Sequence, residues 1–487
     1  MIHQKKSFVI LLFLLQVLMV QAKDYPASLF RIKSDGVTLN TRSIQFGIDY
    51  ISKNGGGRLV FYVGRYLTGS IHLKSNVTIQ LEEGAVLVGS VNPFDYDRSA
   101  LSAALVLADG QENIGITGKG VIDGQGRALA NNTIENVHNG LIKDPLKYDR
   151  TQERPMIIYM RSCRNVRMNH ITLQNSAFWL QTYDQCKNLL VDSVTVHNVA
   201  FWNSDGVDIV DCDSVQVSNC YIDAADDGIC LKSHDAKAFC NNVLIRNNVV
   251  RSSANGIKFG TASRGGFRNI KILNNTVFDT YRSAIALESV DGGFLEDVVV
   301  DGLKSVHTGN VIFLRLGERV AGKKSTMQRI TIRNVVAEVP QDKPDAGYDY
   351  EGPVEDMPRN ISPVIIAGLP GQYINDITFS NIDIKYPGGG KALFANVPLD
   401  KLESIPEMAA SYPEFSMFKE VPAWGIYIRH ARNLHFSDIK LKAEKKDYRL
   451  PIVMDDVQAA QLDQIKIEQI GLKKIYHAYK SSEVNVK

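Results

Sequence analysis

Four stretches of this sequence repeat one pattern: CRNVRMNHITLQN (163–175), CKNLLVDSVTVHN (186–198), CDSVQVSNCYIDA (212–224) and CNNVLIRNNVVRS (240–252). In each, a polar residue and then Asn or Ser lead into alternating Val, Ile or Leu residues, which is typical of a short β-strand. The phrase recurs along the chain, and between Asn165 and Asp297 its copies are 23, 26, 28, 27 and 28 residues apart. These steps are too long for a β-hairpin and lack the helical half of a βαβ unit, so they indicate a repeating coil.

Each repeat holds short strands rich in Val, Ile and Thr, and asparagines follow them. These asparagines should occupy tight corners, where a residue that tolerates the left-handed conformation is needed. They are Asn175, Asn198, Asn219, Asn247 and Asn275. We therefore predict an all-β fold, a right-handed parallel β-helix that forms a single domain over residues 23–487, with coils stacked about 4.8 Å apart.

Three further segments have expected places in such a solenoid. Cys163, Cys186, Cys212 and Cys240 share one offset in the repeat, so they should form a column of buried thiols, with a disulfide between neighbouring coils as the alternative. Residues 41–53 have the apolar spacing of a helix and should form a small N-terminal cap over the open end of the solenoid. Residues 386–422 break the period and should form a long insertion folded against a groove.

The N-terminus and the charge balance restrict where the protein acts and what it binds. Lys5 and Lys6 precede an apolar run, Phe8 to Val20, that is shorter than the ~20 residues of a spanning helix. We interpret residues 1–22 as a cleaved signal peptide and expect a secreted or periplasmic protein without a membrane span. With 55 basic and 53 acidic side chains, the chain has no strong positive electrostatic field that would attract nucleic acid. We also expect a monomer.

Stacking the repeat aligns four coils and brings carboxylates together. The coils are 203–210, 225–232, 253–260 and 281–288, with Val207, Ile229, Ile257 and Ile285 as one inward column. Strand alternation then predicts that Asp208, Lys232, Lys258 and Glu288 point outward. Asp205 and Asp227 become vertical neighbours, and Asp226 lies beside them.

Three carboxylates this close need a physical reason, because like charges ~4 Å apart repel by about 4 kcal/mol at an effective dielectric of 20. One carboxyl group kept protonated by its neighbours can act as an acid while the others activate water, as in glycoside hydrolysis. The alternatives are a Ca²⁺ site and a solvated turn in which Asp-Gly serves only the backbone. We expect neither a metal nor another cofactor.

At these residues the chain resembles glycoside hydrolase family 28, the polygalacturonases and rhamnogalacturonan hydrolases, and the resemblance covers nearly all of the chain after residue 22. Asn203-Ser204-Asp205 is similar to the family's Asn-Thr-Asp, and Asp226-Asp227 to its Asp-Asp. The resemblance implies a parallel β-helix and an inverting mechanism. It makes Asp226 the general acid, while Asp205 and Asp227 hold and deprotonate the attacking water.

Two family motifs are absent. Asn255 stands where polygalacturonases have the His of Gly-His-Gly, and Ala286-Leu287-Glu288 replaces Arg-Ile-Lys, which grips a galacturonate on the leaving-group side. Glu288 would repel that carboxylate. We therefore expect a galacturonate-containing pectic substrate with a neutral leaving-side sugar, most simply the galacturonosyl-rhamnose linkage of rhamnogalacturonan.

Other residues near the aspartates are candidates for substrate binding. Lys232, Lys258 and Arg282 could hold a galacturonate carboxylate on the non-leaving side, or else balance the acidic charges. Trp202 could stack on a sugar or pack beneath a loop. Asn203 and Asn255 complete the predicted site, and Arg429-His430 could reach the groove from the end of the insertion.

Other functions remain open at this stage. A polygalacturonase, cutting internally or from an end, would use the same carboxylates. A polysaccharide lyase would need Ca²⁺ and a base such as Lys258. A non-catalytic glycan-binding β-helix would keep the aspartates only as a relic.

Overall fold

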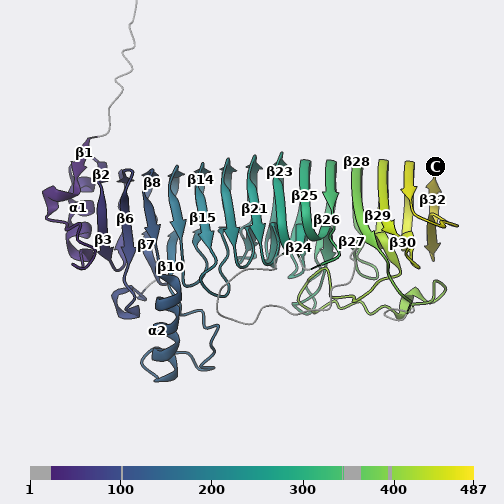
Figure 1. Cartoon of the computed structure of the whole chain (residues 1–487), viewed down its shortest axis with the longest axis horizontal. Helices are drawn as coiled ribbons and strands as arrows, with labels where there is room; N and C mark the ends of the chain where they lie inside the picture. The colour runs from purple at the N-terminus through teal and green to yellow at the C-terminus, as the bar shows by residue number, and fades with distance from the viewer. Residues whose placement is uncertain (1–22, 100–101, 343, 345–362, 393–396) are drawn as a thin grey trace, which may run out of the picture.

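The computed structural model describes residues 23–99, 102–342, 344, 363–392 and 397–487. The apolar run from Phe8 to Val20, interpreted above as a signal peptide, lies outside them. The described strands stack side by side along one axis, with the N-terminal coils at one end and the C-terminal coils at the other (Figure 1). No described helix is both long and apolar enough to cross a membrane.

Three faces of parallel strands build the N-terminal part of the solenoid, up to Leu273. The first face contains β1 (Asp24–Pro26), β2 (Gly57–Phe61), β5 (Val77–Leu81), β8 (Glu112–Gly118), β11 (Arg164–Asn169), β14 (Lys187–Asp192), β17 (Asp213–Ser218), β20 (Cys240–Arg246) and β23 (Gly266–Leu273). The second face contains β3 (Gly64–Thr68), β6 (Ala85–Gly89), β9 (Val121–Asp123), β12 (Thr172–Gln174), β15 (Thr195–Asn198), β18 (Tyr221–Ala224) and β21 (Val249–Ser252). The third face contains β4 (Ile71–His72), β7 (Ala104–Asp109), β10 (Met156–Arg161), β13 (Gln181–Asp184), β16 (Val207–Val210), β19 (Ile229–Ser233) and β22 (Ile257–Ser263).

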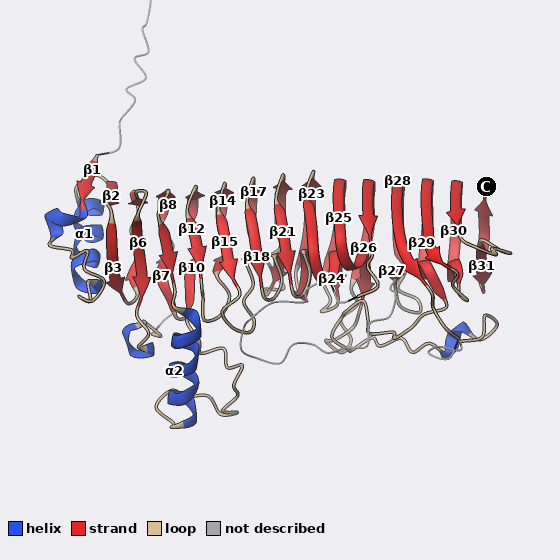
Figure 2. Cartoon of the chain, in the orientation of Figure 1, coloured by secondary structure: helices blue, strands red, loops and turns tan. Residues whose placement is uncertain are grey.

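The C-terminal coils continue these faces through longer strands. They are β24 (Thr276–Ser289), β25 (Phe294–Leu316), β26 (Thr326–Glu338), β27 (Val364–Ala367), β28 (Ile374–Gly388), β29 (Ala423–Lys445), β30 (Leu450–Glu468), β31 (Tyr476–Tyr479) and β32 (Ser482–Val486). Strand β24, for example, pairs in parallel with β21 on the second face and with β22 on the third. The predicted parallel β-helix is confirmed, and strands dominate the whole described chain (Figure 2).

The corners of the coils follow the repeated phrase. The Asn or Ser that leads into the strand has a positive φ in all four quoted copies, as at Asn165 (56°), Asn188 (55°) and Asn242 (54°). Of the five corner asparagines predicted above, Asn175, Asn219 and Asn247 are left-handed. The prediction is wrong for Asn198 and Asn275, whose side chains are instead buried.

These two asparagines bond between coils. The side chain of Asn198 accepts from the Ser176 amide at 2.9 Å and donates to the carbonyl of Asp205 at 3.0 Å. That of Asn275 accepts from the Asn248 amide at 3.0 Å. Buried polar groups need such partners, so both residues stabilise the stack rather than the turn.

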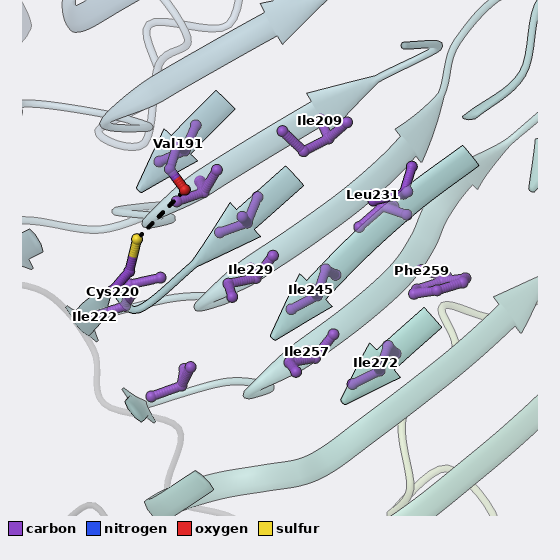
Figure 3. Packing of buried hydrophobic residues seen from close by; sticks show 14 of the residues in the cluster. Val191, Ile209, Cys220, Ile222, Ile229, Leu231, Ile245, Ile257, Phe259 and Ile272 are labelled. Carbon is purple, nitrogen blue, oxygen red and sulfur yellow. Dashed lines mark hydrogen bonds between the residues drawn. The ribbon is translucent and has the colours of Figure 1, made fainter. Parts of the chain in front are cut away.

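Inward columns of branched side chains form the core. Val207, Ile229, Ile257 and Ile285 are in register from coil to coil, and so are Ile209, Leu231, Phe259 and Leu287, as predicted. Figure 3 shows Ile209, Leu231 and Phe259 facing Val191, Ile245 and Ile272 of the first face across the interior. All of these side chains are buried, which supplies the main driving force for folding.

The cap and the cysteine column also lie where the sequence placed them. Helix α1 (Thr41–Lys53) buries Ile44, Ile48 and Ile51 against the first coils. Cys163, Cys186, Cys212 and Cys240 occupy successive coils as buried free thiols. Three smaller elements, α2 (Gly126–His138) and the 3₁₀ turns Ala27–Phe30 and Pro93–Asp95, lie in the N-terminal half.

The insertion between β28 and β29 covers part of the third face. Its described residues include the 3₁₀ turn Leu402–Ser404 and an apolar group, Leu402, Ile405, Phe415, Phe418 and Val421. This group packs on outward side chains of the C-terminal coils, namely Ala286, Phe313, Ile365 and Tyr427. The third face is therefore covered at its C-terminal end.

Candidate active site

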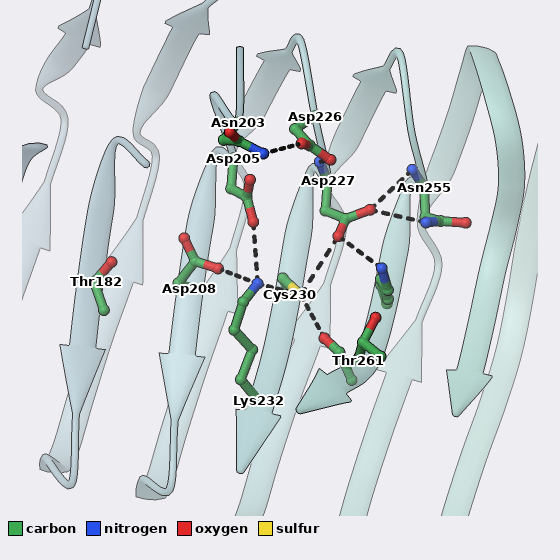
Figure 4. A network of polar contacts seen from close by, with 12 residues as sticks. Thr182, Asn203, Asp205, Asp208, Asp226, Asp227, Cys230, Lys232, Asn255 and Thr261 are labelled. Carbon is green, nitrogen blue, oxygen red and sulfur yellow. Dashed lines mark hydrogen bonds and ion pairs between the residues drawn. The ribbon is translucent and has the colours of Figure 1, made fainter. Parts of the chain in front are cut away.

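The three predicted aspartates gather at the third face, in the turns that lead into β16 and β19. The Gly206 amide donates to the carbonyl of Asp227 at 2.9 Å, which makes Asp205 and Asp227 neighbours on successive coils. Asp205 and Asp227 are buried, while Asp226 is half-buried. Figure 4 shows all three carboxylates with two asparagines and the lysine of β19 around them.

Lys232 links Asp205 to Asp208. Its Nζ lies 3.0 Å from Asp205 Oδ2 and 2.7 Å from Asp208 Oδ1 (Figure 4). Burial raises the pKa of both carboxyls, and the ammonium opposes this rise. Burial alone would lower the pKa of Lys232, but Asp208 and Asp205 together raise it well above its usual value, so Lys232 is charged.

Lys258 is the ammonium partner of Asp227. Its Nζ lies 3.1 Å from Asp227 Oδ2, and the amide of Asn255 donates to Asp227 Oδ1 at 2.8 Å. Burial alone would raise the pKa of Asp227, yet Lys258, Lys232 and Arg282 lower it to about 2. Asp227 is therefore ionised at any ordinary pH, as a group that activates water must be.

Asp226 has the opposite character. The side-chain amide of Asn203 donates to Asp226, with Nδ2 3.4 Å from Oδ2. Burial and the charge of Asp227 raise the pKa of Asp226, although Arg282 and the two lysines partly offset this. Two adjacent carboxyls with opposite pKa shifts are the arrangement from which acid and base roles are assigned.

The cluster also contains a set of atoms that could hold a metal ion. One carboxylate oxygen each of Asp205 and Asp227 and the thiol of Cys230 lie within 4.8 Å of one another. Lys232 Nζ lies 2.9 Å from Cys230 Sγ, and each of the two carboxylates pairs with a lysine. The lysine ammonium groups thus already supply the positive charge that a cation would bring.

Residues 59–290 match the family model for glycosyl hydrolases family 28. This segment belongs to glycosyl hydrolases family 28. The chain is 27% identical over 319 residues to a Vitis vinifera protein named "Probable polygalacturonase", a match that covers 61% of this chain and 58% of the relative. It is 24% identical over 421 residues to the exo-poly-alpha-D-galacturonosidase of Dickeya chrysanthemi, covering 72% of this chain and 70% of the relative.

The fold is shared with solved structures of the family. The family 28 exopolygalacturonase of Yersinia enterocolitica superposes with a TM-score of 0.64 at 17% identity, over 95% of this chain and 78% of that one. The chain spans little more than half of the Vitis relative, and the segment matched by the family model ends at Val290, at the third-face end of β24.

Beyond the three aspartates, the structure differs from the predictions for substrate binding. Lys232 and Lys258 do leave the solenoid interior, but they are only 7% and 1% exposed, so they are not open to a substrate. Asp208 and Glu288 are buried as well. Of the two interpretations of the lysines, charge balance is the one that the geometry supports, because each ammonium is held by carboxylates of the cluster.

Glu288 does not meet the role predicted from the missing Arg-Ile-Lys motif. It is 1% exposed, and burial raises its pKa to about 8, so its carboxyl is mostly neutral near pH 7. The predicted repulsion of a leaving-side carboxylate by this residue is therefore wrong. The motif's cations are still missing, however, and Arg282 is engaged with Glu414 at 3.0 Å.

The remaining candidates are placed as follows. Trp202 is half-buried and the guanidinium of Arg150 lies 3.8 Å from its ring centroid, so a residue of the chain already covers one of its sides. Arg429 pairs with Glu407 at 2.6 Å, and His430 lies between Glu407 and Asp456. Both residues therefore anchor the insertion.

Sequence reasoning missed three residues that touch the site. The buried guanidinium of Arg154 donates to Asn203 Oδ1 at 3.1 Å and thereby orients the donor to Asp226. Tyr412 Oη lies 3.0 Å from Lys258 Nζ, and Glu414 holds Arg282. No local pattern marks them, because each contacts a partner far away in the sequence.

Proposed function

We propose that this protein is an inverting glycoside hydrolase that acts on galacturonate-containing pectic chains. The observation that carries the proposal is the carboxylate cluster, in which Asp226 tends to keep its proton while Asp227 is ionised. Asp226 would protonate the leaving oxygen, and Asp205 and Asp227 would position and deprotonate the water. The named activities of the Vitis and Dickeya relatives support a pectic substrate.

Within this class, we propose the galacturonosyl-rhamnose bond of rhamnogalacturonan as the target. The resemblance to the family's motifs implies that the leaving side lies toward Glu288. There, the described cations Lys258 and Arg282 are each bound to a carboxylate of the chain. A neutral sugar there needs no cation. The insertion also covers the outward side chains beyond Lys258, which favours cleavage at a chain end over cleavage in the middle.

Polygalacturonase activity is the second candidate, because the relatives carry that name. A lyase is disfavoured by the state of Lys258: Asp227 raises the pKa of its ammonium well above the usual value in spite of burial, so it has no lone pair to act as a base. A secreted or periplasmic location and a monomeric state, both expected from the sequence, are part of the proposal.

The test is incubation of the purified protein with rhamnogalacturonan and homogalacturonan oligosaccharides. New reducing ends and absorbance near ~235 nm, which reports an unsaturated uronate, are followed together. We expect reducing ends without absorbance, and faster release from rhamnogalacturonan. Faster cleavage of homogalacturonan would replace the proposed linkage, and products that absorb would overturn hydrolysis itself.

A further inference from the structure

A cavity of about 460 Å³ opens beside the aspartates, on the side away from Glu288. Residues 143–146, 148 and 150–153 form one wall, and Phe178, Trp179 and Asn203 form the other. Asn203 is also the donor to Asp226, so the cavity begins at the reacting groups. A sugar bound there would lie next to the cleaved bond, on the non-leaving side.

Arg150 lines this cavity, and no ion pair with a described residue balances its guanidinium group. Arg150 lies flat over Trp202, and its buried Nε has no hydrogen-bond partner among the described residues. Burial and the charge of Arg150 lower the pKa of Arg154 to about 9. Asp226 partly offsets this for Arg154, whereas Arg150 pairs with no carboxylate among the described residues.

None of the acidic side chains of the described segment 143–153 forms an ion pair with Arg150. Glu153 pairs with Arg98 at 2.9 Å, and Asp149 with His138 at 3.1 Å. The Asp144 carboxylate accepts from the Leu146 amide at 3.0 Å. An anion from outside would therefore be the natural partner of Arg150, because guanidinium binds carboxylate in a planar, two-point geometry.

The opposite wall of the cavity is aromatic. Trp179 stacks on Phe178 with ring centroids 5.3 Å apart and an interplanar angle of 7°, and Trp179 itself is half-buried. Lys232 Nζ lies over the same Trp179 ring, 4.4 Å from its centroid, so this wall offers an apolar surface beside a sugar rather than an open ring face for stacking.

We propose that this cavity is the subsite for a uronate on the non-leaving side, and that Arg150 binds the uronate carboxylate. The inference rests on the proposed function, and it gives to Arg150 the role that Lys232 and Lys258 cannot perform. It makes Arg150 a specificity-determining residue on a segment that the repeat pattern does not reach.

Binding of galacturonate and of its methyl ester to the intact protein tests this, followed by tryptophan fluorescence because Trp202 lies under Arg150. The wild-type protein should bind the acid more tightly than the ester. Arg150→Gln should weaken binding of the acid about 10- to 100-fold and leave the ester unchanged. Lys147→Gln, which removes a cation of the same segment that does not line the cavity, should bind like the wild type.

Equal binding of acid and ester by the wild type, no binding of either, or an unchanged affinity in Arg150→Gln would overturn the inference. An unfolding temperature of Arg150→Gln that differs from that of the wild type would reveal a misfolded variant. Arg150→Lys then replaces it, because it keeps the charge and should retain part of the preference for the acid over the ester. Because no bond is cleaved, the result is independent of hydrolysis. Selective loss of acid binding without any pectic hydrolysis would refute the proposed function alone.

Discussion

One outward column of the third face differs sharply between its two halves. Toward the N-terminal side the column runs through Asp208, Cys230 and Lys258, which belong to the polar cluster. In the next coils the same column becomes Ala286, Phe313, Ile365 and Tyr427. The backbone is equivalent throughout, so the side chains alone decide which half can do chemistry.

The apolar half explains the insertion. Exposed apolar columns of this size would be unfavourable in water, and the insertion buries them under Leu402, Phe415 and Phe418. The polar half faces cavities instead. The same outward surface of the solenoid thus changes at Lys258, within one coil, from the polar candidate site to the apolar surface on which the insertion packs.

Asp226→Asn tests the catalytic role of the polar half and should have the largest effect. A general acid contributes about 10²- to 10⁴-fold, so turnover of natural oligosaccharides should fall by that factor. The fold should survive, because the raised pKa already favours an uncharged group at this position. Steady-state kinetics and a thermal melt measure both, with Asp301→Asn, which breaks a surface pair with Arg333 on the first face, as control. A near wild-type rate would exclude Asp226 as the acid.

Lys258→Met tests the boundary between the halves. It leaves Asp227 buried without its ammonium partner, and loss of one member of a buried pair costs about 3–5 kcal/mol of unfolding free energy. Urea unfolding should show this loss. Adding Asp227→Asn should restore part of it, since the uncompensated charge is then gone. A single variant as stable as the wild type would mean that Lys258 does not balance Asp227.

Glu288→Gln tests whether Glu288, in the first coil that the insertion covers, makes stability depend on pH. The folded protein holds the Glu288 proton more tightly than the unfolded chain, with a pKa of about 8 against 4.5. Stability from this group is therefore full below about pH 4.5 and is lost as pH rises through 8. Each pKa unit is worth about 1.4 kcal/mol, so urea unfolding at acid and alkaline pH should resolve the difference.

The glutamine variant has no carboxyl group to titrate at this position. As pH rises from acid to alkaline, the wild type should therefore lose unfolding free energy that the variant keeps. Parallel pH profiles for the two proteins would contradict the burial of a protonated Glu288.

Tyr412→Phe should have the smallest effect. It removes only the hydroxyl that contacts Lys258 and keeps the aromatic ring of the insertion. A single hydrogen bond contributes about 0.5–1.5 kcal/mol, which a careful denaturation curve can detect. Tyr448→Phe, whose hydroxyl meets Glu420 at the surface, is the matched control and should cost less. Equal losses would show that the insertion is not fastened to the site through Tyr412.

The fold was predictable because its signals are local and repeated. The left-handed asparagine of the phrase and the alternation that follows set both the corner and the inward column, coil after coil. Asn198 and Asn275 misled the prediction, since a buried amide ladder and a left-handed corner both favour asparagine. The coincidence of Asp205 with Asp227 followed from the same period, without any knowledge of contacts.

The sequence by itself therefore determined the solenoid, the α1 cap, the cysteine column and the meeting of the three aspartates, because a constant period converts spacing into position. Only the tertiary structure decided what state those groups are in. Lys258 and Tyr412 are 154 residues apart, and nothing in either neighbourhood foretells their contact. Burial depends on such distant segments, and burial is what pairs Lys232 with carboxylates and keeps Glu288 protonated. It also leaves Arg150 over Trp202 beside an open cavity.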